Sequence, residues 1–169
     1  VLLRTHSDKK GDSVKNQLNV RRSLEGNAMT IGIEGGTEVA FSLRGGAPVY
    51  RNGTLVGVVS VGIRLDQASM VDTLKQELAS EVTFFKGNTR IATTLADSSG
   101  RRATGTALND TAITSTVLER GQTYTSDRVT LLGRPYAVLY EPLRNGAGSL
   151  TGIFFLGIPQ EVQESPFDS

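Results

Sequence analysis

Apolar and polar positions alternate with a period of two over many short stretches of this chain, which is the pattern of half-buried β-strands. Strands are predicted over residues 1–6, 37–44, 55–65, 81–86, 89–95, 124–132, 136–143 and 149–158. Apolar residues with helical spacing predict helices over 13–25, 66–80 and 111–119. The run over 55–65 is almost continuously apolar, so we expect it at the centre of its sheet. Many strands without long crossover connections predict an α+β fold with antiparallel sheets.

The two halves of the chain repeat each other. Matching residues are separated by 94 or 95 positions, as in Leu24 and Leu118, Gly26 and Gly121, Pro48 and Pro142, and Gly57 and Gly152. Each match falls on a turn or a strand landmark, which indicates one supersecondary unit used twice. We therefore predict two modules, at 1–65 and 81–159, joined by a helix at 66–80 and followed by a tail at 160–169.

Composition excludes several classes of function. The net charge is +1 and no block of like charges is present, so nothing indicates a nucleic-acid or lipid surface. The chain has no cysteine, which excludes disulfides and thiolate metal sites, and its single histidine, His6, is too little for a zinc site. No nucleophile elbow or phosphate-binding glycine motif is present. The sequence thus predicts no enzyme, no metal and no cofactor.

Polar residues inside the apolar strands of the first half are candidates for binding. Ser42 and Arg44 share one strand face by alternation, as do Arg4 and His6, and Ser60 interrupts the apolar return strand. A guanidinium fork with hydroxyls and an imidazole suits a carboxylate ligand. The alternative for Arg44 is an exposed side chain or an ion pair with an acidic residue of the same module.

The second half offers another set of candidates. Tyr124, Tyr136 and Tyr140 are expected to line a small pocket, with Arg90, Thr93 and Thr94 opposite them. The alternative is that these tyrosines form an aromatic core with cross-strand packing.

Two runs of residues resemble a known family. The first half contains Arg4-x-His6, Gly11-Asp12-Ser13, Leu24-Glu25-Gly26, Ser42-Leu43-Arg44 and Val56–Gly62. These resemble the extracytoplasmic Cache (PAS-like) sensor domains of bacterial receptors. The second run comprises Val82–Leu95, Gly121–Tyr124 and Leu132–Pro142. It looks like the membrane-proximal module of double-Cache methyl-accepting chemotaxis proteins.

The resemblance implies tandem Cache modules in the periplasmic part of an inner-membrane receptor. It implies a homodimer that binds a small carboxylate and transmits a conformational signal to a chemotaxis output. A histidine-kinase input domain and a ligand-free dimerisation or interaction module are the alternatives. The first half is also similar to the citrate and dicarboxylate sensor kinases, which implies that its candidates Arg4, His6, Ser42, Arg44 and Ser60 hold carboxylates. Gly46 replaces the lysine of the citrate pattern, which favours a smaller acid, and the long N-terminal helix of such sensors is not found in the first module.

Overall fold

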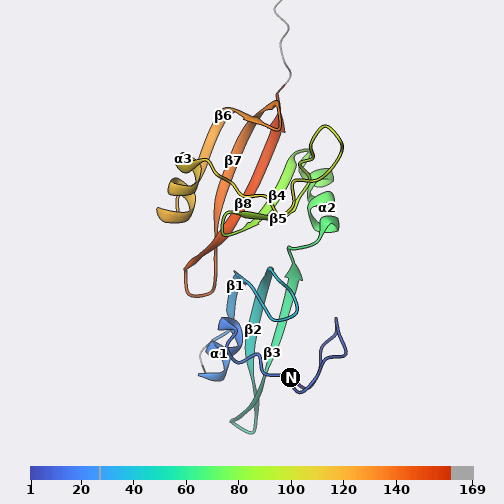
Figure 1. The fold of residues 1–169 in the computed structure, drawn as a ribbon. Coiled ribbons are helices and arrows are strands. Elements are labelled where there is room, and N and C mark those ends of the chain that lie inside the picture. Colours follow the sequence, from blue (N-terminus) through green and yellow to red (C-terminus); the bar gives the residue numbers. More distant parts are fainter. Residues whose placement is uncertain (27, 161–169) are drawn as a thin grey trace, which may run out of the picture. The chain divides into compact units, whose positions relative to one another are not determined.

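The computed structural model describes residues 1–26 and 28–160 (Figure 1). The chain divides into two compact units. The first unit contains Val1–Arg64 with Arg144–Ser149, and the second contains Leu65–Leu143 with the residues from Leu150 onward. Among the described residues, no helix is long and apolar enough to cross a membrane.

The first unit is one helix on a three-stranded antiparallel sheet. The helix α1 (Leu18–Leu24) precedes β1 (Thr30–Glu34), β2 (Ser42–Arg51) and β3 (Thr54–Arg64), and the strand order is β1-β2-β3. Asn52 and Gly53 turn the chain between β2 and β3 with φ angles of 50° and 77°, as the Asn-Gly pair predicts. The helix crosses β2 at Gly46, where an added Cβ would lie 2.8 Å from the Asn19 carbonyl oxygen.

The second unit is a five-stranded sheet with helices. Its elements are α2 (Ala68–Leu78), β4 (Glu81–Lys86), β5 (Thr89–Thr93), α3 (Thr111–Thr114), the π-helix η1 (Ser115–Glu119), β6 (Tyr124–Leu131), β7 (Arg134–Arg144) and β8 (Leu150–Pro159). The strand order is β5-β4-β8-β7-β6. The hairpins predicted in this half and the helix predicted over 66–80, which is α2, are confirmed to within a few residues.

Both faces of this second sheet bury apolar side chains. On one face, Phe85, Tyr140 and Phe155 form the main core with Ile113 of α3 and Val117 of η1. Alternation places Val82, Phe84 and Ala92 on the other face, where they are buried and where α2 packs against β4 and β5 through its fully buried Val71.

The repeat of the sequence corresponds to a repeated order of elements. A helix followed by three neighbouring strands occurs as α1-β1-β2-β3 and again as α3-η1-β6-β7-β8. The second sheet is extended by β4 and β5, because β4 pairs with the outer edge of β8. The corresponding strand of the first sheet, β3, pairs among the described residues with β2 alone.

Several sequence predictions differ from the structure of the first unit, among them the strand predicted over 37–44, of which residues 37–41 form no strand. Residues 1–6 form no strand. The apolar run that we expected at the centre of its sheet is the edge strand β3, and most of its residues are exposed. The strand β1 was not predicted, since five residues with a central glycine, Thr30–Glu34, give too short a pattern.

Candidate functional site

Ser42 and Arg44 point inward together on β2, as alternation predicts. Arg44 is buried, and its Nε donates to Ser42 Oγ at 2.5 Å. Its Nη1 donates to Gln17 Oε1 at 2.7 Å and its Nη2 to the carbonyl oxygen of Val39 at 3.2 Å. Several of the guanidinium donors are thus used by neutral groups of the first unit, and no sequence pattern pointed to Gln17 or Val39 as their partners.

Ser60 lies on β3 directly opposite Gly46 of β2. Its Oγ accepts a hydrogen bond of 2.6 Å from Nδ2 of Asn19, a residue of α1 that sequence reasoning missed. The backbone N–H of Asn19 donates to Glu34 Oε1 at 3.4 Å. This hydroxyl therefore ties α1 to the edge of the sheet.

Arg4 and His6 do not share a strand face, because their segment is not a strand. Both Nη atoms of Arg4 donate to the Asp12 carboxylate at 2.6 Å, and Nη1 also donates to the Lys9 carbonyl oxygen at 2.7 Å. His6 is exposed. The Arg4 guanidinium is thus already paired with a carboxylate of the same unit.

The Arg4–Asp12 pair predicts a measurable titration. Hydrogen bonding to Arg4, opposed by desolvation, lowers the Asp12 pKa from 3.8 to about 2. The Asp12 pKa is lower in the folded state than in the unfolded state, so the ion pair stabilises the folded state. This contribution is complete above the ordinary carboxyl pKa and is lost as the pH falls toward 2. NMR titration of the Asp12 carboxyl carbon should give this pKa, and Arg4→Gln should return it toward 3.8. An Asp12 pKa that Arg4→Gln leaves unchanged would contradict the pairing.

In the second unit, Arg90 and Tyr140 carry buried polar atoms without partners. The Arg90 guanidinium carbon lies 5.0 Å from the centroid of the Phe85 ring, and Nη1 donates to Thr106 Oγ1 at 3.0 Å and to the Ala107 carbonyl oxygen at 3.2 Å. Arg90 Nε and the hydroxyl of Tyr140 are buried with no hydrogen-bond partner among the described residues. Buried polar groups are rarely left unpaired, so this pair needs an explanation.

Arg90 and Tyr140 also influence each other's pKa. Burial lowers the pKa of Arg90, and burial raises the pKa of Tyr140 to about 12. The charge of Arg90 lowers the Tyr140 pKa, whereas the carboxylate of Asp110 raises it. The Asp110 carboxylate is itself used to cap α3, through the amides of Ala112 and Ile113. Near neutral pH the site therefore presents a guanidinium and a neutral phenol, which are both donors.

The other predicted residues of the second half have different positions. The Tyr124 ring meets the Tyr140 ring edge-on, with centroids 6.1 Å apart, so it belongs beside the Arg90–Tyr140 pair. Tyr136 is buried in the core. Thr93 and Thr83 share a buried hydrogen bond of 2.6 Å between their hydroxyls, and Thr93 Oγ1 also accepts from the Leu95 amide. Thr93 is thus used inside the fold.

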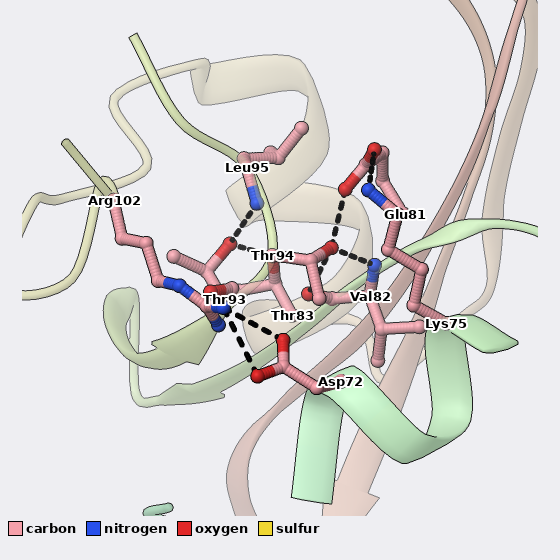
Figure 2. Close-up of polar contacts among 9 residues, drawn as sticks. All are labelled: Asp72, Lys75, Glu81, Val82, Thr83, Thr93, Thr94, Leu95 and Arg102. Carbon is pink, nitrogen blue, oxygen red and sulfur yellow. Dashed lines mark hydrogen bonds and ion pairs between the residues drawn. The ribbon is translucent and has the colours of Figure 1, made fainter. Parts of the chain in front are cut away.

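Figure 2 shows that the polar groups around Thr93 bind one another. Lys75 of α2 pairs with Glu81 of β4 at 2.6 Å, and Asp72 of α2 pairs with Arg102 at 2.8 Å. Arg102 Nη1 also donates to the Thr93 carbonyl oxygen at 3.1 Å. These contacts connect α2 to β4, β5 and the Arg102 loop.

A surface depression of about 490 Å³ opens in the second unit between the β4–β5 turn and the helical segment α3–η1. It is lined by Gly87, Asn88, Leu108, Asn109, Thr114, Leu118 and Glu119. Its Leu108–Asn109 wall follows directly in sequence on the Thr106–Ala107 segment, which accepts hydrogen bonds from Arg90. No sequence signal pointed to this depression, and the described residues contain no cluster of three or more potential metal ligands.

The comparisons with known proteins agree on the type of fold. The family model "Single cache domain 3" matches residues 63–168, more than half of the chain, and no curated protein matches the sequence. A solved structure of "Methyl-accepting Chemotaxis protein X" has a similar fold, with a TM-score of 0.52 and 16% sequence identity. The match covers 89% of this chain and 57% of the chain in that structure. At this identity the likeness shows the fold alone.

Two further structures are similar at lower scores. One is the ligand-binding domain of the Pseudomonas fluorescens chemoreceptor CtaA with L-serine, with a TM-score of 0.47 and 13% identity over 92% of this chain and 66% of that one. The other is the ligand-binding domain of the Pseudomonas aeruginosa PAO1 amino acid chemoreceptor PctC with GABA. Its TM-score is 0.42 and its sequence identity is 13%, over 90% of this chain and 66% of that one. The chain thus spans less than two thirds of the length of each of these structures.

The family match bears on the predicted tandem arrangement. It describes a single Cache domain and begins at the end of β3, so it supports one module, in the second unit, where the sequence predicted two. Over residues 63–168, the chain belongs to the single Cache domain 3 family.

Proposed function

We propose that this chain is the extracytoplasmic ligand-binding region of a bacterial membrane receptor, and that its second unit binds a small organic anion between Arg90 and Tyr140. One observation carries the choice of site: Arg90 Nε and the Tyr140 hydroxyl are buried donors without an acceptor. Membership of the Cache family supports the sensor role. The first unit, with the same order of helix and strands, is proposed as a second and shorter module of this kind.

A carboxylate fits these donors chemically. Its two oxygens accept from a guanidinium and from a phenol at once, and hydrogen bonds to a charged group are stronger than neutral ones. Each unpaired buried donor costs about 1–3 kcal/mol, which ligand binding would recover. Thr106 and Ala107 accept hydrogen bonds from Arg90, so we expect the ligand to enter when this segment moves and the adjacent depression to accommodate the rest of the molecule.

Signalling follows if the ligand stabilises one arrangement of the sheet more than another, and the response is bounded by that difference in affinity. Tyr140 lies on β7 and its ring is 4.9 Å from that of Phe155 on β8, so an occupied site contacts the strand that leads to the C-terminal residues. In the receptor proposed here, those residues lead toward the membrane and to a chemotaxis or kinase output. Ser42, Arg44 and Ser60 stay a second predicted site for the same class of ligand.

A melting scan against carboxylates and amino acids tests the proposal. A ligand at about 100 times its dissociation constant adds about 2.7 kcal/mol of stability, so the wild type should show a clear rise in Tm. Arg90→Gln should abolish this rise, whereas Arg128→Gln, an exposed arginine of β6, should keep it. No shift with any compound would contradict the proposal. A shift that survives Arg90→Gln and is lost in Arg44→Gln would place the site in the first unit.

Tyr140→Phe should separate stability from binding. The change removes a buried hydroxyl without a partner, so the ligand-free protein should unfold at the same free energy or up to about 1 kcal/mol higher. Affinity for the ligand found in the scan should fall about tenfold, because one donor is lost. Urea unfolding and isothermal titration measure the two effects. A clear loss of stability in the ligand-free variant would show that the hydroxyl has an internal partner.

A further inference from the structure

The second unit gathers its large exposed apolar side chains at one end. Leu78 is 45% exposed, Leu132 is 53% exposed and Ile158 is 54% exposed, and no other large apolar side chain among the described residues of this unit is as exposed as these. The three, called the exit residues below, lie at the end of α2, in the turn between β6 and β7, and at the end of β8. Exposed apolar residues that occur singly are ordinary, so their gathering is what needs an explanation.

The exit residues lie at the end of the sheet from which the chain leaves. Glu81, the first residue of β4, pairs with Gly157 of β8, which brings the end of α2 near the end of β8. The amide of Gln160 donates to the carbonyl oxygen of Pro135 at 2.9 Å, which holds the start of β7 beside the same strand end. Figure 1 shows the β6–β7 turn and the end of β8 together at this end of the unit.

Leu132 occupies a backbone conformation that disfavours leucine. The Asn52-Gly53 turn of the first unit has φ angles of 50° and 77°, and the Leu132-Gly133 turn has nearly the same angles, 50° and 80°. Asparagine is favoured at the first of these positions, whereas a bulky side chain at positive φ is strained. An exposed leucine in a strained position stabilises neither the turn nor the core, which points to a contact outside the chain.

We propose that the exit residues contact the headgroup interface of the membrane that anchors the receptor. The inference rests on the receptor proposed above, in which the residues after Gln160 lead toward the membrane. A leucine in a two-residue turn projects beyond the sheet, and the exposed guanidinium of Arg134, two positions on, suits a lipid phosphate. Three half-exposed side chains remove less apolar surface from water than an acyl anchor, which alone binds membranes only marginally. The contact therefore orients an anchored unit and does not recruit a free one.

Tryptophan fluorescence tests this contact, because the chain contains no tryptophan. The chain is tethered through a C-terminal histidine tag to vesicles of phosphatidylethanolamine and phosphatidylglycerol that carry a nickel-chelating lipid, with or without brominated acyl chains. The emission of Leu132→Trp should shift to shorter wavelength on tethering and should be quenched by the brominated chains. Its matched control is Asn52→Trp, in the turn of the same geometry, whose emission should change in neither respect.

A second reporter leaves the turn intact. Ile158→Trp should also be quenched, and adding Leu132→Asn should lower this quenching at least about threefold, because a leucine is removed from the interface. Leu132→Asn alone should raise the urea midpoint of the untethered protein, because asparagine fits the positive φ angle, so unfolding cannot account for lost quenching.

Three outcomes would overturn the membrane contact: no quenching of Leu132→Trp, equal quenching of Asn52→Trp, or quenching of Ile158→Trp that Leu132→Asn leaves unchanged. The melting scan against carboxylates and amino acids uses no vesicles. Failure of the ligand site and failure of the membrane contact are therefore distinguishable.

Discussion

Replacing Phe155 by alanine is expected to lower the free energy of unfolding of the second unit by about 3–5 kcal/mol. Phe155 of β8 is almost fully buried, and its ring centroid lies 4.9 Å from that of Tyr140. The substitution leaves a cavity that neighbouring strands cannot close, because every one of them is fixed by backbone pairing. Urea unfolding followed by tyrosine fluorescence and by circular dichroism measures the loss.

Ile158→Ala is the control for this prediction. Ile158 lies on the same strand and is 54% exposed, so its truncation should change the free energy of unfolding by about 0.5 kcal/mol or less. Equal effects of the two substitutions would show that β8 is not buried as described.

Val71→Asp is expected to cost the second unit about 3 kcal/mol or more and to detach α2 from β4 and β5. Val71 has no exposed surface, and a carboxylate there would be buried without a partner. The ion pairs Lys75–Glu81 and Asp72–Arg102 also connect α2 to the rest of the unit (Figure 2). They are partly exposed and are each worth about 1 kcal/mol or less, so they cannot hold the helix once the apolar contact is lost.

Hydrogen exchange of the α2 amides measures this detachment. The amides should lose most of their protection in Val71→Asp. They should keep it in Gln76→Asp, which adds the same charge at an exposed position of the same helix. Protection that is equally low in both variants would mean that helix propensity rather than burial holds α2 in place.

Features that depend on neighbouring residues could be predicted from the sequence. The Asn52-Gly53 turn and the hairpin around Gly87 are confirmed, because positive φ angles and alternating strands are local properties. The position of β3 could not be predicted in the same way. A continuous apolar run is typical of a central strand, and pairing partners far along the chain decide whether both of its faces are buried.

The same distinction applies to the candidate site. Alternation predicted that Ser42 and Arg44 share a face, which the hydrogen bond between them confirms. Their other partners, Gln17 and Val39, lie in a helix flank and a loop whose positions no period specifies. The pairing of Arg4 with Asp12 was missed because a strand was assumed where the chain turns back on itself.

The π-helix η1 explains a small irregularity of the sequence repeat. Leu24 and Gly26 are two positions apart, whereas their counterparts Leu118 and Gly121 are three positions apart. The amide of Arg120 donates to the Ser115 carbonyl oxygen, five residues back, at 3.1 Å, so one wide turn accommodates the additional residue. The second half thus contains one more residue than the first at this point, beside the depression, and β6 still follows the helix as β1 follows α1. A residue removed from this turn is therefore expected to convert the π-helix to an ordinary helical turn and to leave the strand order of the sheet unchanged.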